Sequence, residues 1–427
     1  MSSIDWIVLI LTLLTIVAYG LYKSKNVKTI DGYILSDRSL PWYTVGLSVM
    51  ATQASAITFL SAPGLAYSSG MSFAQFYFGL PLAMIVLCIT FVPIFHKLKV
   101  YTAYEFLEKR FDVRTRVLTA ALFLIQRGIS TGITIFAPAI ILSTILKIDL
   151  TMTTIGIGSL VVIYTVYGGT KAVSYTQLLQ MSIIFGGLLL AGVLVVHFLP
   201  EDIGFIEALH IAGKSGKANA IDFKFDLDNQ YTVWSGLIGG FFLQLSYFGT
   251  DQSQVGRYLT GSSVKESRLG LLMNGLLKVP MQFCILLIGI LVFAYYQYHT
   301  PPLFFNQQVI ERLENSNHKQ EYENIKQRHE ELSEEKTVYI NQLTDALKTK
   351  QHDQIDQAKS ELLKFNQNDQ KLRDELIALI ERNDPSADTN DNNYIFLRFV
   401  TDTFPKGLIG LLIAIIFLAS MGATASA

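Results

Sequence analysis

Nine apolar blocks, each close to the length of a membrane-crossing helix, alternate with polar loops along the chain. A helix that crosses the hydrocarbon core of a bilayer needs about 20 predominantly apolar residues. The pattern therefore predicts an all-α integral membrane protein. The blocks cover residues 4–22, 42–65, 73–95, 117–146, 152–167, 178–198, 233–248, 269–296 and 407–427.

One long polar segment, 305–393, interrupts this pattern and is dense in Glu, Lys, Gln and Asn. Its apolar residues recur at helical spacing in narrow stripes, such as Leu372, Leu376 and Leu379, which predicts a helical hairpin or a coiled coil. Mixed charge runs are usually solvated helix faces. A solvated insertion without chemistry is one interpretation, and a surface for a protein partner is the other.

Positive charges in the loops predict the orientation of the spans, because short loops rich in Lys and Arg stay in the cytoplasm. One set of alternate loops is rich in them and the other set is poor, which predicts an outside N-terminus and an extracytoplasmic 305–393 segment. The rich set contains Lys23, Lys25, Lys28, Arg38, Lys97, Lys99, Lys109, Arg110, Arg114, Arg116, Lys171, Arg257, Lys265 and Arg268. Outside 305–393, the poor set contains Lys147, Lys214, Lys217 and Lys224.

Composition excludes several classes of function. The chain is 50% hydrophobic and 16% charged, which is too apolar for an ordinary soluble enzyme. Its net charge of −1 gives no basic field, so we expect no nucleic-acid partner. The two cysteines, Cys88 and Cys284, form neither a disulfide framework nor a zinc cluster. No phosphate-binding loop or catalytic triad is present in the sequence, so we expect neither an enzyme nor a cofactor.

The second block, 42–65, carries hydroxyl and amide groups near the middle of the bilayer, including Gln53, Ser55 and Thr58. Such residues permit local unwinding, and backbone carbonyls freed in this way can coordinate a cation. The alternative is a helix interface of small residues, which also favours Ala, Ser and Thr.

Two basic residues lie deep in predicted spans. Arg127 follows Arg116 by about 16 Å of helix, which places it near the bilayer centre. A guanidinium there needs either a substrate carboxylate or an internal acid. Lys278 follows Arg268 by about 15 Å, too far for its ammonium to reach the cytoplasm easily.

Three stretches carry a resemblance to a known family: 51–64, then 164–173 with Thr176 and Gln180, and 249–259. With the order of the spans, they resemble a bacterial member of the sodium/solute symporter family. The resemblance implies a LeuT-type five-plus-five inverted repeat, with an extra N-terminal helix and a site at the midplane. It predicts an extra helix and basic loop in 1–41, core helices in 42–304, an extracytoplasmic insertion in 305–393 and an incomplete eighth core helix in 394–427. Two further core helices are then expected beyond Ala427.

The resemblance also implies a sodium site. Its first-helix carbonyls fall on Ala51 and Ala54, and its two hydroxyl positions fall on Gly422 and Ala423. A family aspartate on a cation path is Gln177 here. Because a hard cation prefers oxygen ligands, sodium coupling, proton coupling and uncoupled transport all stay open. The hydroxyls available as substitutes nearby are those of Ser420 and Thr424.

For the solute, the resemblance to the sugar-transporting members implies Tyr247 as inner gate and Gln244 and Lys278 as contacts. Ordinary helix packing is the alternative for Tyr247 and Gln244, which lie three residues apart on nearly the same face. The sialic-acid members are similar at four more positions: Ser55, Thr58, Gln75 and Arg127.

These residues favour a secondary transporter that moves a small organic anion, either a carboxylate or a sialic-acid-like solute, by cation symport and alternating access. Its expected location is the bacterial cytoplasmic membrane. A sodium-independent facilitator and a solute-sensing membrane domain of the same fold are the alternatives.

Overall fold

The computed structural model describes residues 1–25, 29–146, 148–226, 228–349 and 351–427, so the loop residues Lys28 and Lys147 lie outside the described part. Every named element in that part is a helix, and one isolated β-bridge joins Leu40 to Gly261. The N-terminal elements are α1 (Ser3–Ser24), α2 (Ile30–Leu35), η1 (Ser36–Arg38), α3 (Trp42–Gln53), α4 (Ala56–Ser69), η2 (Ser72–Tyr77), α5 (Leu80–Ile89), α6 (Phe91–Leu98), α7 (Ala103–Arg110) and α8 (Val113–Leu146).

The remaining elements form the second half of the bundle and the polar insertion. They are α9 (Leu150–His197), α10 (Phe205–Lys214), the π-helix η3 (Ser235–Gly239), α11 (Gly240–Thr250), α12 (Gln252–Leu259), α13 (Val264–Tyr298), α14 (Gln307–Glu314), α15 (Lys319–Thr349), α16 (His352–Asn383), α17 (Asn392–Thr403) and α18 (Leu408–Ser426).

Six helices in the described residues are long and apolar enough to cross a bilayer, and the bent pair α3 and α4 gives a seventh. Two of the nine predicted blocks do not reach that length and hydropathy separately. The block at 152–167 falls on a shorter apolar helix, and the block at 233–248 is divided between η3 and α11. The fifth and sixth blocks lie on the single element α9, which turns at Gly169, where a positive φ of 55° suits glycine.

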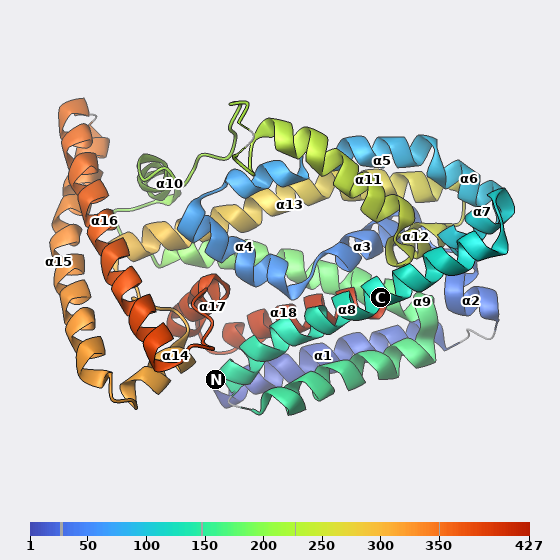
Figure 1. The fold of residues 1–427 in the computed structure, drawn as a ribbon, viewed down its shortest axis with the longest axis horizontal. Coiled ribbons are helices and arrows are strands. Elements are labelled where there is room, and N and C mark those ends of the chain that lie inside the picture. The colour runs from blue at the N-terminus through green and yellow to red at the C-terminus, as the bar shows by residue number, and fades with distance from the viewer. Residues whose placement is uncertain (26–28, 147, 227, 350) are drawn as a thin grey trace.

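The long helices run side by side along the longest axis of the molecule (Figure 1). At one end, Asp5 of α1 ties the bundle together, since its buried carboxylate accepts the backbone N–H of Gly407 at 2.5 Å and of Gly410 at 3.3 Å. These amides belong to the start of α18, whose N–H groups have no partners within the helix.

The insertion forms a hairpin of two long helices, α15 and α16, which stands across one end of the bundle (Figure 1). Its leucine stripes close the hairpin from inside: one cluster contains Tyr322, Ile325, Leu372, Leu376 and Leu379, and a second contains Ile340, Leu343, Ile355, Ala358 and Leu362. Because these stripes are buried between two helices with charged outer faces, the segment folds outside the apolar bundle.

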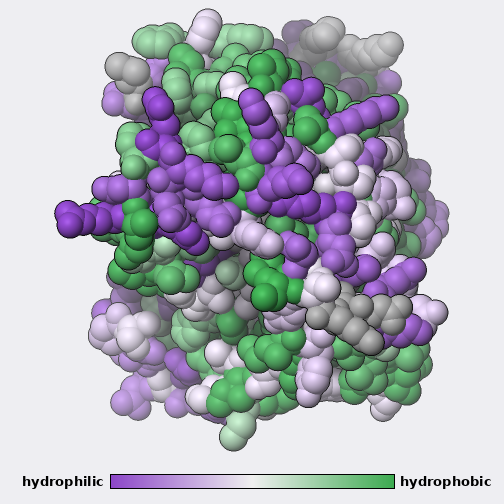
Figure 2. Space-filling model, turned by 90° about the vertical axis from the view of Figure 1, so that its right-hand side faces the viewer, coloured by the Kyte–Doolittle hydropathy of each residue, from purple (hydrophilic) through white to green (hydrophobic). Residues whose placement is uncertain are grey.

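The N-terminus lies at the same end of the bundle as the hairpin, while α2, α6 and α7 lie at the opposite end (Figure 1). Figure 2 looks onto that opposite end and shows hydrophilic side chains gathered across its middle, between hydrophobic ones. This end contains the loops rich in Lys and Arg, among them Lys97, Lys109 and Arg114. The hairpin and the basic loops are therefore separated by the length of the bundle.

Candidate functional site

The first core span is broken near its middle. Helices α3 and α4 meet at an angle of 64°, with Ala54 and Ser55 between them in extended conformation. The hydrogen bonds beside the break run from Ala54 N to Met50 O and from Thr58 N to Ser55 O. In the described residues, the carbonyl oxygens of Ala51 and Ala54 therefore accept no hydrogen bond. The side chains of Ser55 and Thr58 are half-buried at this break.

A second break separates α11 from α12 at Asp251, whose carboxylate caps α12 by accepting the N–H of Ser253 at 2.8 Å. Gln244 lies on α11 and is buried, and its Oε1 accepts the Nε2 of Gln53 at 3.2 Å. This hydrogen bond joins the two broken spans. The structure thus places Gln244 beside the first break, and Tyr247, one turn later, beside Arg127 and Asp251.

Arg127 has an internal acid. Its guanidinium lies 3.8 Å from the carboxylate of Asp251 and donates to the hydroxyl of Ser253. Both charged side chains are only 14% exposed, so the pair is largely shielded from water. The Asp251 carboxylate compensates the charge of the buried guanidinium, while Arg127 Nε has no hydrogen-bond partner in the described residues. The structure therefore favours the internal acid of the two partners expected for Arg127, and links α8 to the second break.

Lys278 differs from Arg127 because no acidic side chain faces it in the described residues. Its ammonium is fully buried and, in the described part of the chain, has neither a hydrogen bond nor an ion pair. The Tyr77 ring centroid lies 5.9 Å from Nζ. One turn later, both amide atoms of Gln282 are buried without partners as well. Lys278 is thus a buried amine at mid-span, and its charged form would require an anion or hydrogen-bond acceptors.

The flanking glycines show which way this face of α13 points. A Cβ on Gly275 would lie 2.9 Å from Met84 of α5, and a Cβ on Gly289 would lie 2.2 Å from the Pro63 carbonyl of α4. On a helix with 3.6 residues per turn, Gln282 points between these two directions. The polar stripe of α13 therefore faces into the bundle, between α4 and α5.

Gln75 has a different environment from the one expected for a solute contact. Its Nε2 donates to the carbonyls of Tyr231 at 2.8 Å and Ser72 at 3.3 Å, and its Oε1 accepts the N–H of Asp222 at 2.8 Å. The side chain is fully buried. Both amide atoms of Gln75 are hydrogen-bonded to backbone groups, including two in the loop that precedes η3. Gln75 therefore fixes the position of that loop.

The region expected to hold sodium contains a polar network between α3, α9 and α18. Gln177 accepts the hydroxyl of Ser48 at 2.5 Å, and its Nε2 donates to Gly422 O at 2.9 Å and to Ser426 Oγ at 2.7 Å. The hydroxyls of Thr52 and Ser426 lie 2.8 Å apart. Gln177 therefore uses its amide to connect three helices.

The two hydroxyls expected as substitute ligands do not lie on the Gly422 face of α18. Ser420 donates to the carbonyl of Thr134 on α8 at 3.1 Å. Thr424, like Ser420, is two residues from Gly422, which turns it about 200° around the helix axis. Ala423 contributes no side-chain oxygen. Hydroxyl replacement from α18 is therefore limited to Ser426, which already takes part in the Gln177 network.

Two buried amides were not assigned a role in the candidate site from the sequence: Gln180 and Gln282. Each lies inside an apolar block, which is the signal that could have found them, since polar groups in lipid-spanning helices are costly unless they are used. Gln282 also follows Lys278 by one helical turn.

Fold and site together define a class: a multi-pass helical membrane protein with two interrupted core helices, a buried lysine at mid-span that has no acidic partner in the described residues, and carbonyls at one break that accept no hydrogen bond there. A model of the Sodium:solute symporter family matches residues 33–319, which is more than half of the chain. The chain belongs to this family.

Relatives support the assignment. The human sodium/iodide cotransporter is 32% identical over 275 residues, covering 63% of this chain and 41% of that protein. The sodium/sialic acid symporter of Proteus mirabilis is 31% identical over 298 residues, covering 69% of this chain and 59% of that protein. The chain thus spans about half the length of the curated relatives it matches.

A solved structure shows the same fold. The outward-open, substrate-bound structure of a Na⁺-coupled sialic acid symporter superposes with a TM-score of 0.71 at 23% identity, covering all of this chain and 71% of that one. The expected LeuT-type transporter fold is confirmed.

Proposed function

We propose that this protein is a secondary transporter of the bacterial cytoplasmic membrane that moves a small organic anion together with a cation by alternating access. The N-terminus and the hairpin are outside in this proposal. The relatives named above are sodium-coupled transporters of iodide and of sialic acid. The observation that carries the proposal is Lys278, a fully buried ammonium without a counter-charge in the described residues.

The argument for an anion is electrostatic. An isolated charge inside a low-dielectric interior is costly unless it is paired and hydrogen-bonded. A carboxylated solute supplies both a negative charge and acceptor oxygens, and it supplies them only while it is bound. Gln282, on the next turn of α13, offers both a donor and an acceptor to the polar groups of such a solute. Lys278 and Gln282 would therefore recognise a carboxylate attached to a hydroxylated or amidated body.

The other candidates divide between contact and positioning. Three candidates lie at or beside the first break: Ser55, Thr58 and Gln244. The hydrogen bond between Gln53 and Gln244 links this break to the second one. We assign solute contacts to these three residues. Tyr247 closes the cytoplasmic side in this proposal, and Arg127 positions it through the Asp251 pair.

The test is a thermal-shift panel on the purified full-length protein, with sialic acids, monocarboxylates, neutral sugars and amino acids, each in sodium and in choline buffer. A ligand that binds the folded state raises the melting temperature by mass action. The expected result is stabilisation by a carboxylate. Lys278→Met should abolish it, while the exposed Lys265→Met control should keep it. Two results would overturn the assignment. One is stabilisation by neutral sugars alone, and the other is a preference for anions that is lost in Arg127→Gln but kept in Lys278→Met.

The sodium-independent facilitator stays as a second candidate because of one observation. Gln177 contributes an amide where the resemblance implies an acidic group, and its Nε2 already contacts Gly422 O and Ser426 Oγ. A facilitator would show equal stabilisation by the solute in sodium and in choline. A symporter would show stabilisation that requires the cation.

A further inference from the structure

The loop between α10 and η3 carries three exposed aromatic side chains that lie close together. Phe223 and Phe225 are each 73% exposed, and Trp234, the residue before η3, is 44% exposed. Trp234 Nε1 donates to the carbonyl of Phe223 at 3.1 Å, and the ring centroids of Phe225 and Trp234 lie 6.4 Å apart. Scattered exposed apolar residues are common on proteins, whereas a contiguous exposed patch marks an interaction site.

The base of this loop is fixed on η2, which follows the first broken span. Gln75 Oε1 accepts the N–H of Asp222 and its Nε2 donates to Tyr231 O, both at 2.8 Å, so one side chain holds both sides of the loop. The N–H of Val233 donates to Asp222 O at 2.9 Å and closes the loop at the same place. A Cβ on Gly236 would lie 1.9 Å from Gln75 O, so η3 begins directly against η2. The aromatic patch therefore extends from an ordered base.

The position of the loop indicates what the patch contacts. In Figure 1 the loop between α10 and α11 projects from the long side of the bundle, and the hairpin covers the end. The elements that follow continue the same apolar surface, since Ile238 of η3 and Phe242 and Leu243 of α11 are exposed. Exposed apolar side chains along a membrane-crossing segment face acyl chains. The aromatic patch extends this lipid-facing surface toward the hairpin side, where acyl chains give way to headgroups.

The charges of the loop argue against an electrostatic partner. Its single cation, Lys224, is outnumbered by Asp222, Asp226 and Asp228. Two of these carboxylates serve the loop itself: Asp222 accepts the N–H of Lys224, and Asp226 accepts the N–H of Asp228, both at 2.9 Å. Attraction to a membrane must therefore come from the rings. Tryptophan is enriched at the membrane–water interface, and phenylalanine adds apolar contact area.

We propose that Phe223, Phe225 and Trp234 form a membrane anchor that lies among the phospholipid headgroups of the leaflet on the hairpin side. In the proposed orientation this is the outer leaflet. The anchor holds the start of η3 at a fixed depth. Because the second break lies at Asp251, beyond α11, the anchored part of the second broken span comprises η3 and α11. The inference goes beyond the proposed function and does not depend on which solute or ion is moved.

The experiment measures the depth of Trp234 in the full-length protein, reconstituted in phosphatidylcholine vesicles. The chain has three tryptophans, so Trp6→Phe with Trp42→Phe leaves Trp234 as the only one. Brominated phosphatidylcholine quenches tryptophan fluorescence on contact. Bromine near the headgroup end of the acyl chains should quench at least about twofold more than bromine at the chain ends, which lie about 15 Å deeper. Iodide, present on both sides of the vesicle, reports exposure to water.

Variants in the same background test the rings. Phe223→Ser with Phe225→Ser should lower quenching by brominated lipid about twofold or more and raise quenching by iodide, because most of the apolar area of the patch is lost. Phe111→Ser is the matched control, a phenylalanine 68% exposed at the opposite end of the bundle, and should change neither. Adding phosphatidylglycerol should leave the depth of Trp234 unchanged, since the loop carries more acids than bases.

Four outcomes would overturn the inference. Quenching by iodide but not by lipid would place the loop in water, and protection from both would place it against a protein partner or a second copy of this chain. Strongest quenching at the chain ends would place Trp234 within the span. Unchanged quenching in the double phenylalanine variant would reject these rings as the anchor. The solute panel on the same preparations tests the proposed function separately, because stabilisation by a carboxylate does not require Trp234 to contact lipid.

Discussion

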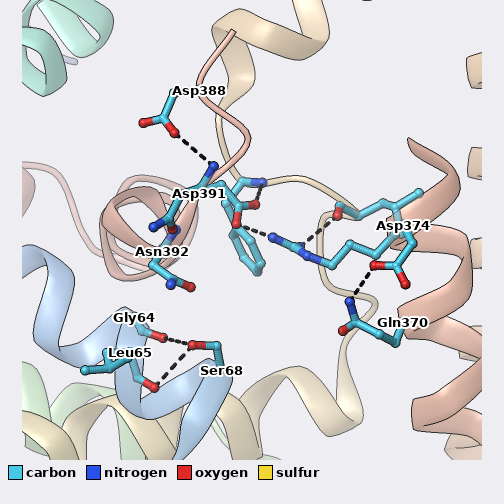
Figure 3. A network of polar contacts seen from close by, with 12 residues as sticks. Gly64, Leu65, Ser68, Gln370, Asp374, Asp388, Asp391 and Asn392 are labelled. Carbon is cyan, nitrogen blue, oxygen red and sulfur yellow. Dashed lines mark hydrogen bonds and ion pairs between the residues drawn. The ribbon is translucent and has the colours of Figure 1, made fainter. Parts of the chain in front are cut away.

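A buried ion pair, Arg373 with Asp391, attaches the hairpin to the bundle and can be tested directly. Arg373 of α16 donates to the carboxylate of Asp391 and to Leu303 O at 3.0 Å, and Asp391 also accepts the N–H of Phe305 at 2.6 Å. Figure 3 shows Asp391 and Asn392 between α16 and the Gly64 turn of α4. Arg373→Met removes the only ion-pair partner that Asp391 has in the described residues.

The expected magnitude follows from burial. The Asp391 side chain is 1% exposed and that of Arg373 is 24% exposed. Removing one partner of a buried pair costs about 3–5 kcal/mol. Arg373 is partly solvated and the Phe305 N–H remains, so the expected cost falls below that range, at about 2–3 kcal/mol. At 1.4 kcal/mol per decade, amide protection around Phe305 and the start of α17 should fall about 30- to 150-fold.

Hydrogen exchange followed by mass spectrometry of the full-length protein measures this loss. Arg328→Met is the matched control, since Arg328 pairs with Glu375 at 2.7 Å in the same hairpin but both side chains are nearly half exposed. An exposed pair contributes about 0–1 kcal/mol, so the control should lose less than about fivefold. Equal losses in the two variants would refute the burial argument.

The pH dependence provides a second check on the same pair. Burial raises the pKa of Asp391, while Arg373 and the backbone amides act to lower it. Without Arg373 the pKa should rise further. A carboxyl whose folded-state pKa lies above its unfolded value stabilises the fold less as pH increases. The deficit of Arg373→Met should therefore shrink as the pH is lowered, because protonation removes the uncompensated charge.

Two further predictions concern the same region. His329 meets two acceptors, Asp369 Oδ1 at 2.8 Å and Pro301 O at 2.9 Å. Burial lowers its pKa, but these bonds raise it to a net value above 6.5. Its stabilisation should be complete below 6.5 and lost as pH rises through the folded-state pKa, and His329→Gln should flatten that change in hairpin amide protection. Gly64→Ala would place a Cβ 1.9 Å from Asn392 O, so it should displace α17 and lower the melting temperature. Gly132→Ala should not, because a Cβ there would meet no described atom within 4 Å apart from its chain neighbours and the backbone of its own helix.

Much of the fold could be predicted from the length of the apolar blocks and from the helical periodicity of the polar segment. Apolar blocks identify spans because every backbone polar group in a bilayer must be satisfied within the segment, and the stripes of Leu372 and Leu376 indicated the hairpin. The partners of polar groups were not predictable, because they are set by contacts between distant segments. Arg127 shows this, since both a solute and an internal acid suited its depth, and only the fold brings Asp251 to it. Gln177 and Gln180 share one helix face, and the sequence alone does not tell which amide is satisfied.

The insertion and the break between α3 and α4 are joined by an unbroken series of contacts. Arg373 holds Asp391 at the start of α17. Asn392 O then contacts Gly64 of α4 so closely that no side chain fits between them. Helix α4 begins at the break beside Ala54 and Ser55. If alternating access tilts α4 at this break, α17 must follow or lose its contact with Gly64, and the Arg373 pair resists that movement. A partner that binds the hairpin in only one of these arrangements would therefore shift the transport equilibrium, by no more than its difference in affinity for the two.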